Sequence, residues 1–284
     1  MKVLIIGAGI AGPVLAMVLK HKGFEPVIYE RYASVPAGGL ALALSAQSFK
    51  VLNIIGLADE AVELGVQTDG FVQRSEITGQ ILQERSGRQP ILRGQTGWPM
   101  TVTLRSKYCD FIVKKAEQRS IPIHWSKKLV DVKQDDDKVI AVFEDGTTDE
   151  GDLLVGCDGL HSKVRDALFG KTPAEYTGVV VIGGWTPYTN ELHPTGQLTS
   201  LSVFGRGCHF FSSPTAEKYF WAVTMPAEAE MLEDWRMAGK LQIGDALASV
   251  PATTWSGDTG RIISGSDEVI RFGLYLRPIP PRLA

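Results

Sequence analysis

The chain has 284 residues, of which 44% are hydrophobic and 21% are charged, and its formal net charge is -3. This is the composition of a globular protein with enough apolar material for one large domain or two medium ones, and it excludes a disordered or fibrous chain. The slightly acidic balance, without any block of Lys and Arg, argues against nucleic acid as a partner and favours a small molecule.

The first 30 residues predict a β-strand, a helix and a second strand. Residues 3–6 and 26–29 are short apolar runs, which are typical of strands covered on both faces. Between them, apolar residues recur at helical spacing over residues 10–22, and Gly23 ends that pattern. We therefore expect a βαβ unit at the start of the chain.

Strand and helix patterns continue to alternate up to about residue 156. Helices are predicted at 46–53, 58–64 and 106–119, strands at 121–125, 129–133, 139–144 and 152–155, a loop over 31–44, and short strands and turns over 67–103. Beyond residue 172, strands rich in Val, Trp, Phe and Tyr are predicted at 179–186, 201–204, 209–212, 219–223 and 269–276, with a largely helical stretch at 227–248.

These patterns predict an α/β fold. We expect a Rossmann-like dinucleotide-binding domain, built on a doubly wound parallel sheet, over residues 1–171, with 67–103 contributing to the substrate side. A mostly antiparallel β-sheet substrate domain with some helices is expected over residues 172–284. No apolar run is long enough to span a membrane, so we expect no transmembrane segment and a cytoplasmic location.

Residues 7–12 read G-x-G-x-x-G directly after a predicted strand and at the start of a predicted helix. In that context Gly7 permits the tight turn, Gly9 lets a pyrophosphate approach the backbone, and Gly12 lets helix and strand pack closely. The free N–H groups and the positive dipole end of the helix then hold the phosphates. We predict a dinucleotide-binding turn, which includes Ile10 and Ala11 between the glycines.

Glu30 lies at the end of the second strand, 21 residues after Gly9 (30 - 9). An acidic side chain at this distance accepts hydrogen bonds from an adenosine ribose and disfavours a 2′-phosphate, so the nucleotide is FAD or NAD and not NADP. Taken alone, a solvated carboxylate at the end of a strand is an equally good interpretation. The glycine pattern before it favours ribose binding.

A second strand, turn and helix pattern occupies residues 156–165. Asp158 stands at a strand end, and Ser162 is placed to begin a helix. A helix-capping turn explains this pattern on physical grounds, and a second contact with the cofactor is the functional alternative.

Together, these motifs resemble the class A FAD-dependent monooxygenases, the family of p-hydroxybenzoate and salicylate hydroxylases, over nearly the whole chain. The resemblance rests on the N-terminal glycines, on Glu30-Arg31, on Arg105 at the start of a helix, and on residues 157–165. It implies that the first glycines and Glu30 hold the ADP half of FAD, that Arg105 touches the phosphate and ribityl region, and that Asp158-Gly159 serves FAD and NAD(P)H. It also implies that Gly39, within the Gly38-Gly39-Leu40 loop, runs beside the flavin ring. The predicted cofactor-binding residues are Gly7, Gly9, Ile10, Ala11, Gly12, Glu30, Arg31, Gly39, Arg105, Asp158 and Gly159.

The sequence departs from that family near its end. The family's third motif is a Gly-Asp-Ala-Ala-His sequence followed by a proline and a glycine-rich turn. Gly244-Asp245-Ala246 imitates it, but no buried strand precedes these residues, no histidine follows, and residues 240–250 read as one helix. Residues 270–278 look like the strand before the true motif, so we expect a chain that is truncated before it.

The resemblance implies a monooxygenase that uses FAD, NAD(P)H and O2 to hydroxylate an aromatic or polyketide-like molecule, with a role in secondary metabolism. No catalytic side chain is predicted, because the cofactor carries the chemistry. Several aromatic residues could line a substrate cavity, but the interior of an antiparallel sheet is the better explanation for them. His209 could be a substrate-facing acid or base, but a satisfied sheet histidine is the better explanation, and no catalytic role is assigned to it. The alternatives are a truncated, catalytically silent flavin-fold protein and, less well supported, an NAD-dependent dehydrogenase. The three cysteines show no metal-ligand spacing, so no metal is expected.

Overall fold

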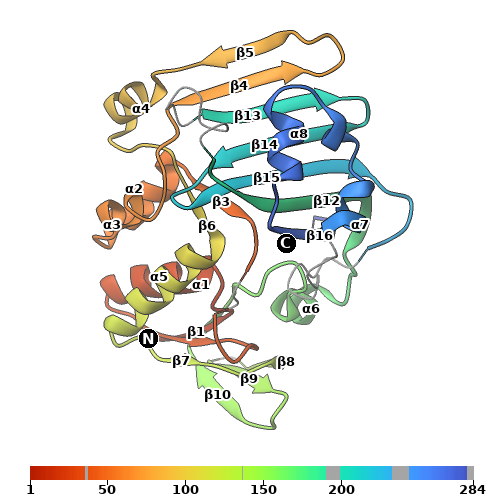
Figure 1. The fold of residues 1–284 in the computed structure, drawn as a ribbon. Helices are drawn as coiled ribbons and strands as arrows, with labels where there is room; N and C mark the ends of the chain where they lie inside the picture. Colours follow the sequence, from red (N-terminus) through yellow and green to blue (C-terminus); the bar gives the residue numbers. More distant parts are fainter. Residues whose placement is uncertain (36–37, 136, 190–198, 232–242, 280–284) are drawn as a thin grey trace. The chain divides into compact units, whose positions relative to one another are not determined.

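The computed structural model describes residues 1–35, 38–135, 137–189, 199–231 and 243–279 (Figure 1). The chain divides into two compact units, each assembled from separate segments. The first unit comprises residues 1–37, 106–175 and 276–284, and the second comprises residues 38–105 and 176–275.

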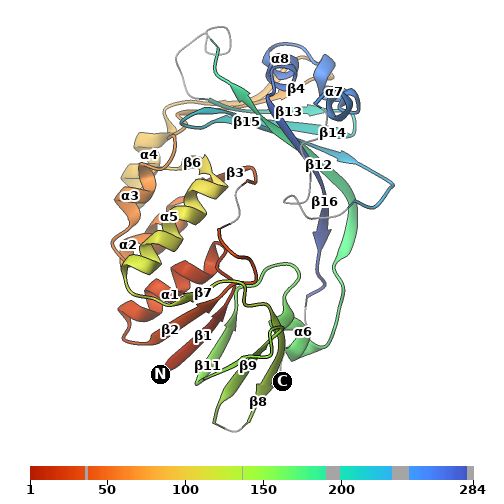
Figure 2. The same cartoon turned by 60° about the horizontal axis from the view of Figure 1, so that its bottom comes forward.

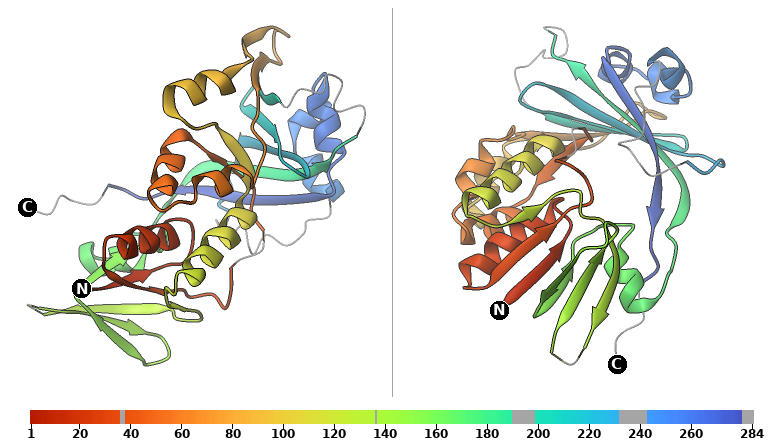
Figure 3. Two further views of the ribbon diagram at one scale, coloured as in Figure 1. Left: turned by 90° about the vertical axis from the view of Figure 1, so that its left-hand side faces the viewer. Right: turned by 90° about the horizontal axis from the view of Figure 1, so that it is seen from below.

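The first unit is built on a parallel four-stranded sheet in the order β11-β1-β2-β7. Its strands are β1 (Lys2–Ile6), β2 (Glu25–Tyr29), β7 (Ile123–His124) and β11 (Leu153–Gly156). Helices α1 (Ala11–His21) and α5 (Arg105–Gln118) lie on one side of this sheet (Figure 3). The predicted parallel sheet is therefore confirmed.

A small antiparallel sheet covers the other face of the parallel sheet. It consists of β8 (Leu129–Gln134), β9 (Val139–Phe143) and β10 (Thr148–Gly151), and α6 (Lys163–Phe169) packs beside it. Leu4 and Ile6 of β1 belong to the core on this side, whereas Ile5 points toward α1, where it is close to Gly12. Both faces of β1 are covered, which explains its continuous apolar run.

The second unit contains a seven-stranded sheet in the order β16-β12-β15-β14-β13-β4-β5. Its strands are β4 (Gly70–Ser75), β5 (Ile81–Arg85), β12 (Glu175–Pro187), β13 (Thr199–Gly205), β14 (Cys208–Pro214), β15 (Lys218–Pro226) and β16 (Glu268–Leu276). Pairing is antiparallel from β12 through β15 and β14 to β13, whereas β13 and β4 run parallel. The mostly antiparallel sheet was predicted.

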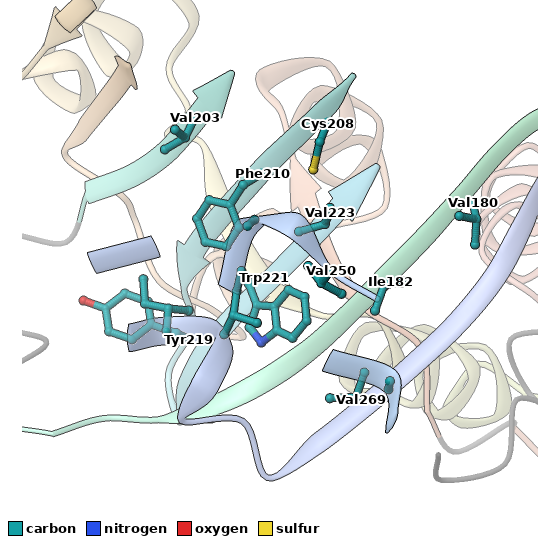
Figure 4. Close-up of a cluster of buried hydrophobic side chains, with 14 residues drawn as sticks. Val180, Ile182, Val203, Cys208, Phe210, Tyr219, Trp221, Val223, Val250 and Val269 are labelled. Atoms are coloured by element: carbon teal, nitrogen blue, oxygen red, sulfur yellow. The ribbon is translucent and has the colours of Figure 1, made fainter. Parts of the chain in front are cut away.

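Helices α7 (Ile243–Ala248) and α8 (Asp258–Ser264) and the 3-10 helix η1 (Pro251–Thr254) cover one face of this sheet (Figure 2). Figure 4 shows the resulting core, in which Trp221 and Phe210 are fully buried against Val250 and neighbouring aliphatic side chains. A separate two-stranded sheet joins β3 (Ala41–Leu44) to β6 (Thr101–Leu104), beside α2 (Ala46–Ile54) and α3 (Ala58–Val62).

The structure differs from the predicted elements in several places. Strand β3 lies within the stretch predicted as a loop, and α4 (Arg88–Thr96) lies within the stretch predicted as strands and turns. Both elements depend on partners or packing that are distant in sequence. Of the predicted helical stretch 227–248, residues 232–242 lie outside the described part of the chain, and α7 forms its end.

Candidate functional site: a glycine turn between strand ends

The glycine turn begins where three strands of the first unit end together. Gly7 follows β1, its N–H donates to the carbonyl of Tyr29 at 2.8 Å, and its φ is 110°. A Cβ at this position would lie 2.5 Å from the carbonyl oxygen of Cys157, which follows β11. Only glycine fits this conformation and this close approach. The turn therefore brings the residues around Asp158 next to the N-terminal glycines.

Gly9 and Gly12 have opposite surroundings. A Cβ at Gly12 would lie 1.9 Å from the carbonyl oxygen of Gly7, so α1 packs directly on the turn. A Cβ at Gly9 would meet no heavy atom within 4 Å. These are the local arrangements predicted for the two positions, namely close packing at Gly12 and open space at Gly9. Whether a cofactor contacts them stays a prediction.

The N-terminus of α1 is not capped by a side chain. Ile10 is the N-cap and makes no side-chain capping hydrogen bond, and the first turn of the helix holds no acidic residue. Ala11, the first residue of the helix, is exposed. Unpaired N–H groups and an uncompensated helix dipole favour an anion at this position.

Glu30 reaches back to the same turn from the end of β2. Its side chain is buried, and one carboxylate oxygen accepts the N–H of Ala8 at 2.8 Å while the other accepts the N–H of Tyr32 at 3.0 Å. Each oxygen keeps lone-pair capacity for a further donor. Arg31 is exposed, and its guanidinium lies over the ring of Tyr32, 4.8 Å from its centroid.

Asp158 accepts hydrogen bonds from the first backbone N–H groups of α6. Its Oδ2 accepts the N–H groups of Lys163 at 2.6 Å and Val164 at 3.2 Å, and Ser162 Oγ accepts the N–H of Arg165 at 3.0 Å. These contacts confirm a capping turn. The second oxygen, Oδ1, is buried and has no hydrogen-bond partner within the described residues. A buried carboxylate oxygen without a donor is costly, and a ligand hydroxyl would satisfy it. Gly159 follows with a φ of 76°.

Gly39 and Arg105 belong to the second unit. Gly38 and Gly39 have φ values of 116° and 100°, and the N–H of Arg105 donates to the carbonyl of Leu40 at 3.1 Å, at one end of the β3 and β6 pair. The structure thus brings these two predicted positions close to each other through the backbone. Their contact with a cofactor stays a prediction.

The sheet of the second unit holds further candidate residues on the face opposite α7 and α8. Trp185, Phe211 and Phe220 form a tilted aromatic group there, with ring centroids 5.7 and 6.0 Å apart. His209 Nε2 lies 2.7 Å from Ser202 Oγ. Ser202 was not predicted as a candidate, because its contact with His209 depends on the pairing of β13 with β14.

Two features are absent from the part of the chain that the structure describes. No group of three or more His, Cys, Asp and Glu side chains in that part of the chain is arranged to hold a metal ion. None of the helices described is long and apolar enough to cross a membrane.

Comparison with known proteins is consistent with this geometry. Residues 1–199 match the model of a family described as FAD binding domain. A flavin-dependent monooxygenase of Legionella longbeachae is 30% identical over 172 residues, which are 60% of this chain and 42% of that protein. The 3-amino-4-hydroxybenzoate 2-monooxygenase of Streptomyces cremeus is 26% identical over 291 residues, covering all of this chain and 69% of that protein.

Among solved structures, Klebsiella pneumoniae HpxO in complex with FAD and uric acid superposes with a TM-score of 0.81. The identity is 24%, and the match covers 98% of this chain and 68% of that one. At this identity the likeness establishes the fold. The match thus covers 42% of the Legionella longbeachae protein and about seven tenths of the other two proteins.

Proposed function

Because the chain belongs to the FAD binding domain family, we propose that it binds FAD and acts as part of a flavin-dependent monooxygenase. The reaction proposed is hydroxylation of an aromatic or polyketide-like molecule with NAD(P)H and O2, in secondary metabolism and in the cytoplasm. The observation that carries the proposal is the buried, unpartnered Oδ1 of Asp158, placed beside an open and uncapped glycine turn.

The residues of the first unit fit the ADP half and part of the linker of FAD. The N–H groups around Gly9 and Ala11 would hold the pyrophosphate, because the space above Gly9 is open and the helix start lacks an anion of its own. Glu30 would accept hydrogen bonds from the adenosine ribose, and Asp158 Oδ1 would accept one from a hydroxyl of the cofactor. Arg31, Gly39, Arg105 and Gly159 complete the proposed set.

The bound flavin would supply the electron transfer and the activation of oxygen. The protein's part is to orient the substrate and keep water away from the reacting atoms. The aromatic group of Trp185, Phe211 and Phe220 supports this role, because flat apolar side chains bind flat apolar rings. The names of two relatives, which specify a hydroxybenzoate and a hydroxynicotinate, support an aromatic substrate.

The test is an FAD titration followed by gel filtration and an absorbance spectrum. Wild-type protein should retain flavin bands and oxidise NAD(P)H in air. Glu30→Gln should weaken FAD binding by roughly ten- to a hundredfold, since a hydrogen bond to a charged group contributes about 1.5–3 kcal/mol. Glu25→Gln, at the exposed start of the same strand, is the matched control and should bind FAD like wild type. A colourless wild-type protein that takes up no FAD would overturn the proposal.

A further inference from the structure

The stretch from Glu30 to Tyr32 is held by a corner of the chain, residues 124–127, at the end of β7. The N–H of Lys127 donates to the carbonyl of Glu30 at 2.7 Å, and the N–H of Ser126 donates to the carbonyl of Tyr32 at 2.8 Å. The corner therefore fixes the backbone of this stretch at both of its ends.

The same stretch sets the direction of the Glu30 carboxylate. Within the described residues, the hydrogen bonds that this carboxylate accepts come from backbone N–H groups, those of Ala8 and Tyr32. One of these two donors thus belongs to the stretch that the corner holds. A shift of the backbone at Tyr32 would turn the carboxylate away from its present direction.

Ser126 has the backbone conformation that lets the corner reach both carbonyls. In an extended strand, successive N–H groups point to opposite sides, so those of Ser126 and Lys127 could not both reach the same stretch. The φ of Ser126 is 57°, in the left-handed region, which residues other than glycine seldom adopt. Its side chain is exposed, so side-chain packing does not explain this conformation.

The side chain of Lys127 fastens the corner to the small antiparallel sheet. Its ammonium group donates to Asp145 and, at 2.8 Å, to Thr147, and both residues lie in the turn between β9 and β10. The hydrogen bond from Lys127 lowers the pKa of Asp145 to about 2, so this carboxylate is charged at neutral pH. The corner is therefore fixed to this turn on one side and to the stretch of Glu30 on the other.

We propose that Ser126 is a positioning residue of the cofactor site, which holds the Glu30 carboxylate in the direction of the adenosine ribose through the backbone of Tyr32. The inference rests on the proposed function and adds to it a residue that acts through Glu30. The preference of the site for a ribose 2′-hydroxyl then depends on the backbone conformation at position 126 and not on the serine hydroxyl.

Ser126→Val tests this dependence, because a β-branched residue resists the left-handed conformation and the position is exposed. The probes are ADP and 2′-deoxy-ADP, which differ in the ribose hydroxyl alone, and their dissociation constants are measured by calorimetry on the protein freed of FAD. Wild type should prefer ADP by roughly tenfold or more, the contribution of a hydrogen bond to a charged group. Ser126→Val should reduce this preference by roughly three- to tenfold. Ser126→Gly adopts the same conformation without strain and should retain the preference.

Ser120→Val is the matched control. Ser120 is also exposed and has a φ of 54°, but it follows the end of α5, where its carbonyl accepts a hydrogen bond from Lys20. The substitution strains the backbone in the same way, so Tm should fall by a similar amount while the preference for ADP stays that of wild type. A preference that is unchanged in Ser126→Val, or that is lost equally in Ser120→Val, overturns the inference.

Amide exchange separates the failure of this inference from the failure of the proposed function. The N–H groups of Ala8 and Tyr32 donate to Glu30, and without nucleotide they should exchange faster in Ser126→Val than in wild type. If FAD is not taken up, the proposed function fails, and exchange alone decides whether Ser126 positions Glu30. If wild type binds FAD but does not prefer ADP to 2′-deoxy-ADP, the inference is overturned while the flavin function stands.

Discussion

Alanine at position 12 would collide with the backbone of the glycine turn, whereas alanine at position 9 would point into open space. The Cβ of Gly12→Ala would lie 1.9 Å from the carbonyl oxygen of Gly7, and real Cβ atoms stay at least 3.0 Å from such atoms, so helix and turn must separate by about 1.1 Å (3.0 - 1.9). Overpacking of this kind costs about 1–3 kcal/mol. The expected fall in Tm is roughly 2–12 °C, given about 2–4 °C per kcal/mol for chains of this size class.

Gly9→Ala should leave the unliganded fold intact. No heavy atom lies within 4 Å of the new methyl group, and the backbone at Gly9 is outside the left-handed region. Replacing a glycine by alanine without backbone strain raises the free energy of unfolding by about 0.4–1 kcal/mol. The methyl group would, however, occupy the space proposed for the pyrophosphate, so FAD affinity should fall by roughly tenfold or more, on the order of one lost charge-assisted hydrogen bond.

Thermal melts without FAD and fluorescence titrations with FAD separate the two effects. Gly12→Ala should lose both stability and affinity, and Gly9→Ala should lose affinity alone. Wild-type FAD affinity in Gly9→Ala would refute the placement of the phosphates. An unchanged Tm in Gly12→Ala would refute the packing of α1 on the turn.

Four further substitutions test other parts of the structure. Asp158→Ala should weaken FAD binding and destabilise α6, whereas Ser162→Ala should cost about 0.5–2 kcal/mol of stability and leave FAD titrations unchanged, since it removes a helix cap alone. Because burial lowers the pKa of His209, its contribution to stability is fully present above pH 6.5 and is lost as the pH falls through the lower folded-state value. Urea unfolding across this range should therefore show less acid sensitivity in His209→Phe than in wild type. Arg277→Ala breaks a half-buried pair with Asp166 (3.1 Å) and should cost about 1–3 kcal/mol, measured as faster amide exchange in α6.

The parts of the fold that follow from local sequence were predicted well. Three short-range signals correspond to β1, α1 and β2. They are the apolar run before Gly7, the helical spacing of apolar residues up to residue 22, and the apolar run that ends at Tyr29. The aromatic strands of the second unit were predicted for the same reason. Glu30 and Asp158 contact their turns at the strand ends where the sequence places them, because these positions are set within a few residues of the glycines and strand ends.

Features that depend on distant partners were not predicted. Residues 41–44 have the composition of a loop, and they form β3 because β6 pairs with them some sixty residues later. The antiparallel sheet on the second face of the β1 sheet involves β10, a polar strand whose sequence carries no apolar alternation. Likewise, the orphaned Oδ1 of Asp158 and the contact of Ser202 with His209 exist only once the chain is folded.

The parallel pairing of β4 with β13 has a consequence for the order in which the protein can fold during its synthesis. Gly70 is paired with Thr199, so the partner of β4 is synthesised 129 residues later (199 - 70). At about 5–20 residues per second, the β4 and β5 hairpin waits on the order of ten seconds with one edge unpaired. Its exposed Ile81 and Leu82 add apolar surface to which wrong partners can bind during this time. Expression in cells depleted of chaperones should therefore reduce the yield of this chain more than its final stability would suggest.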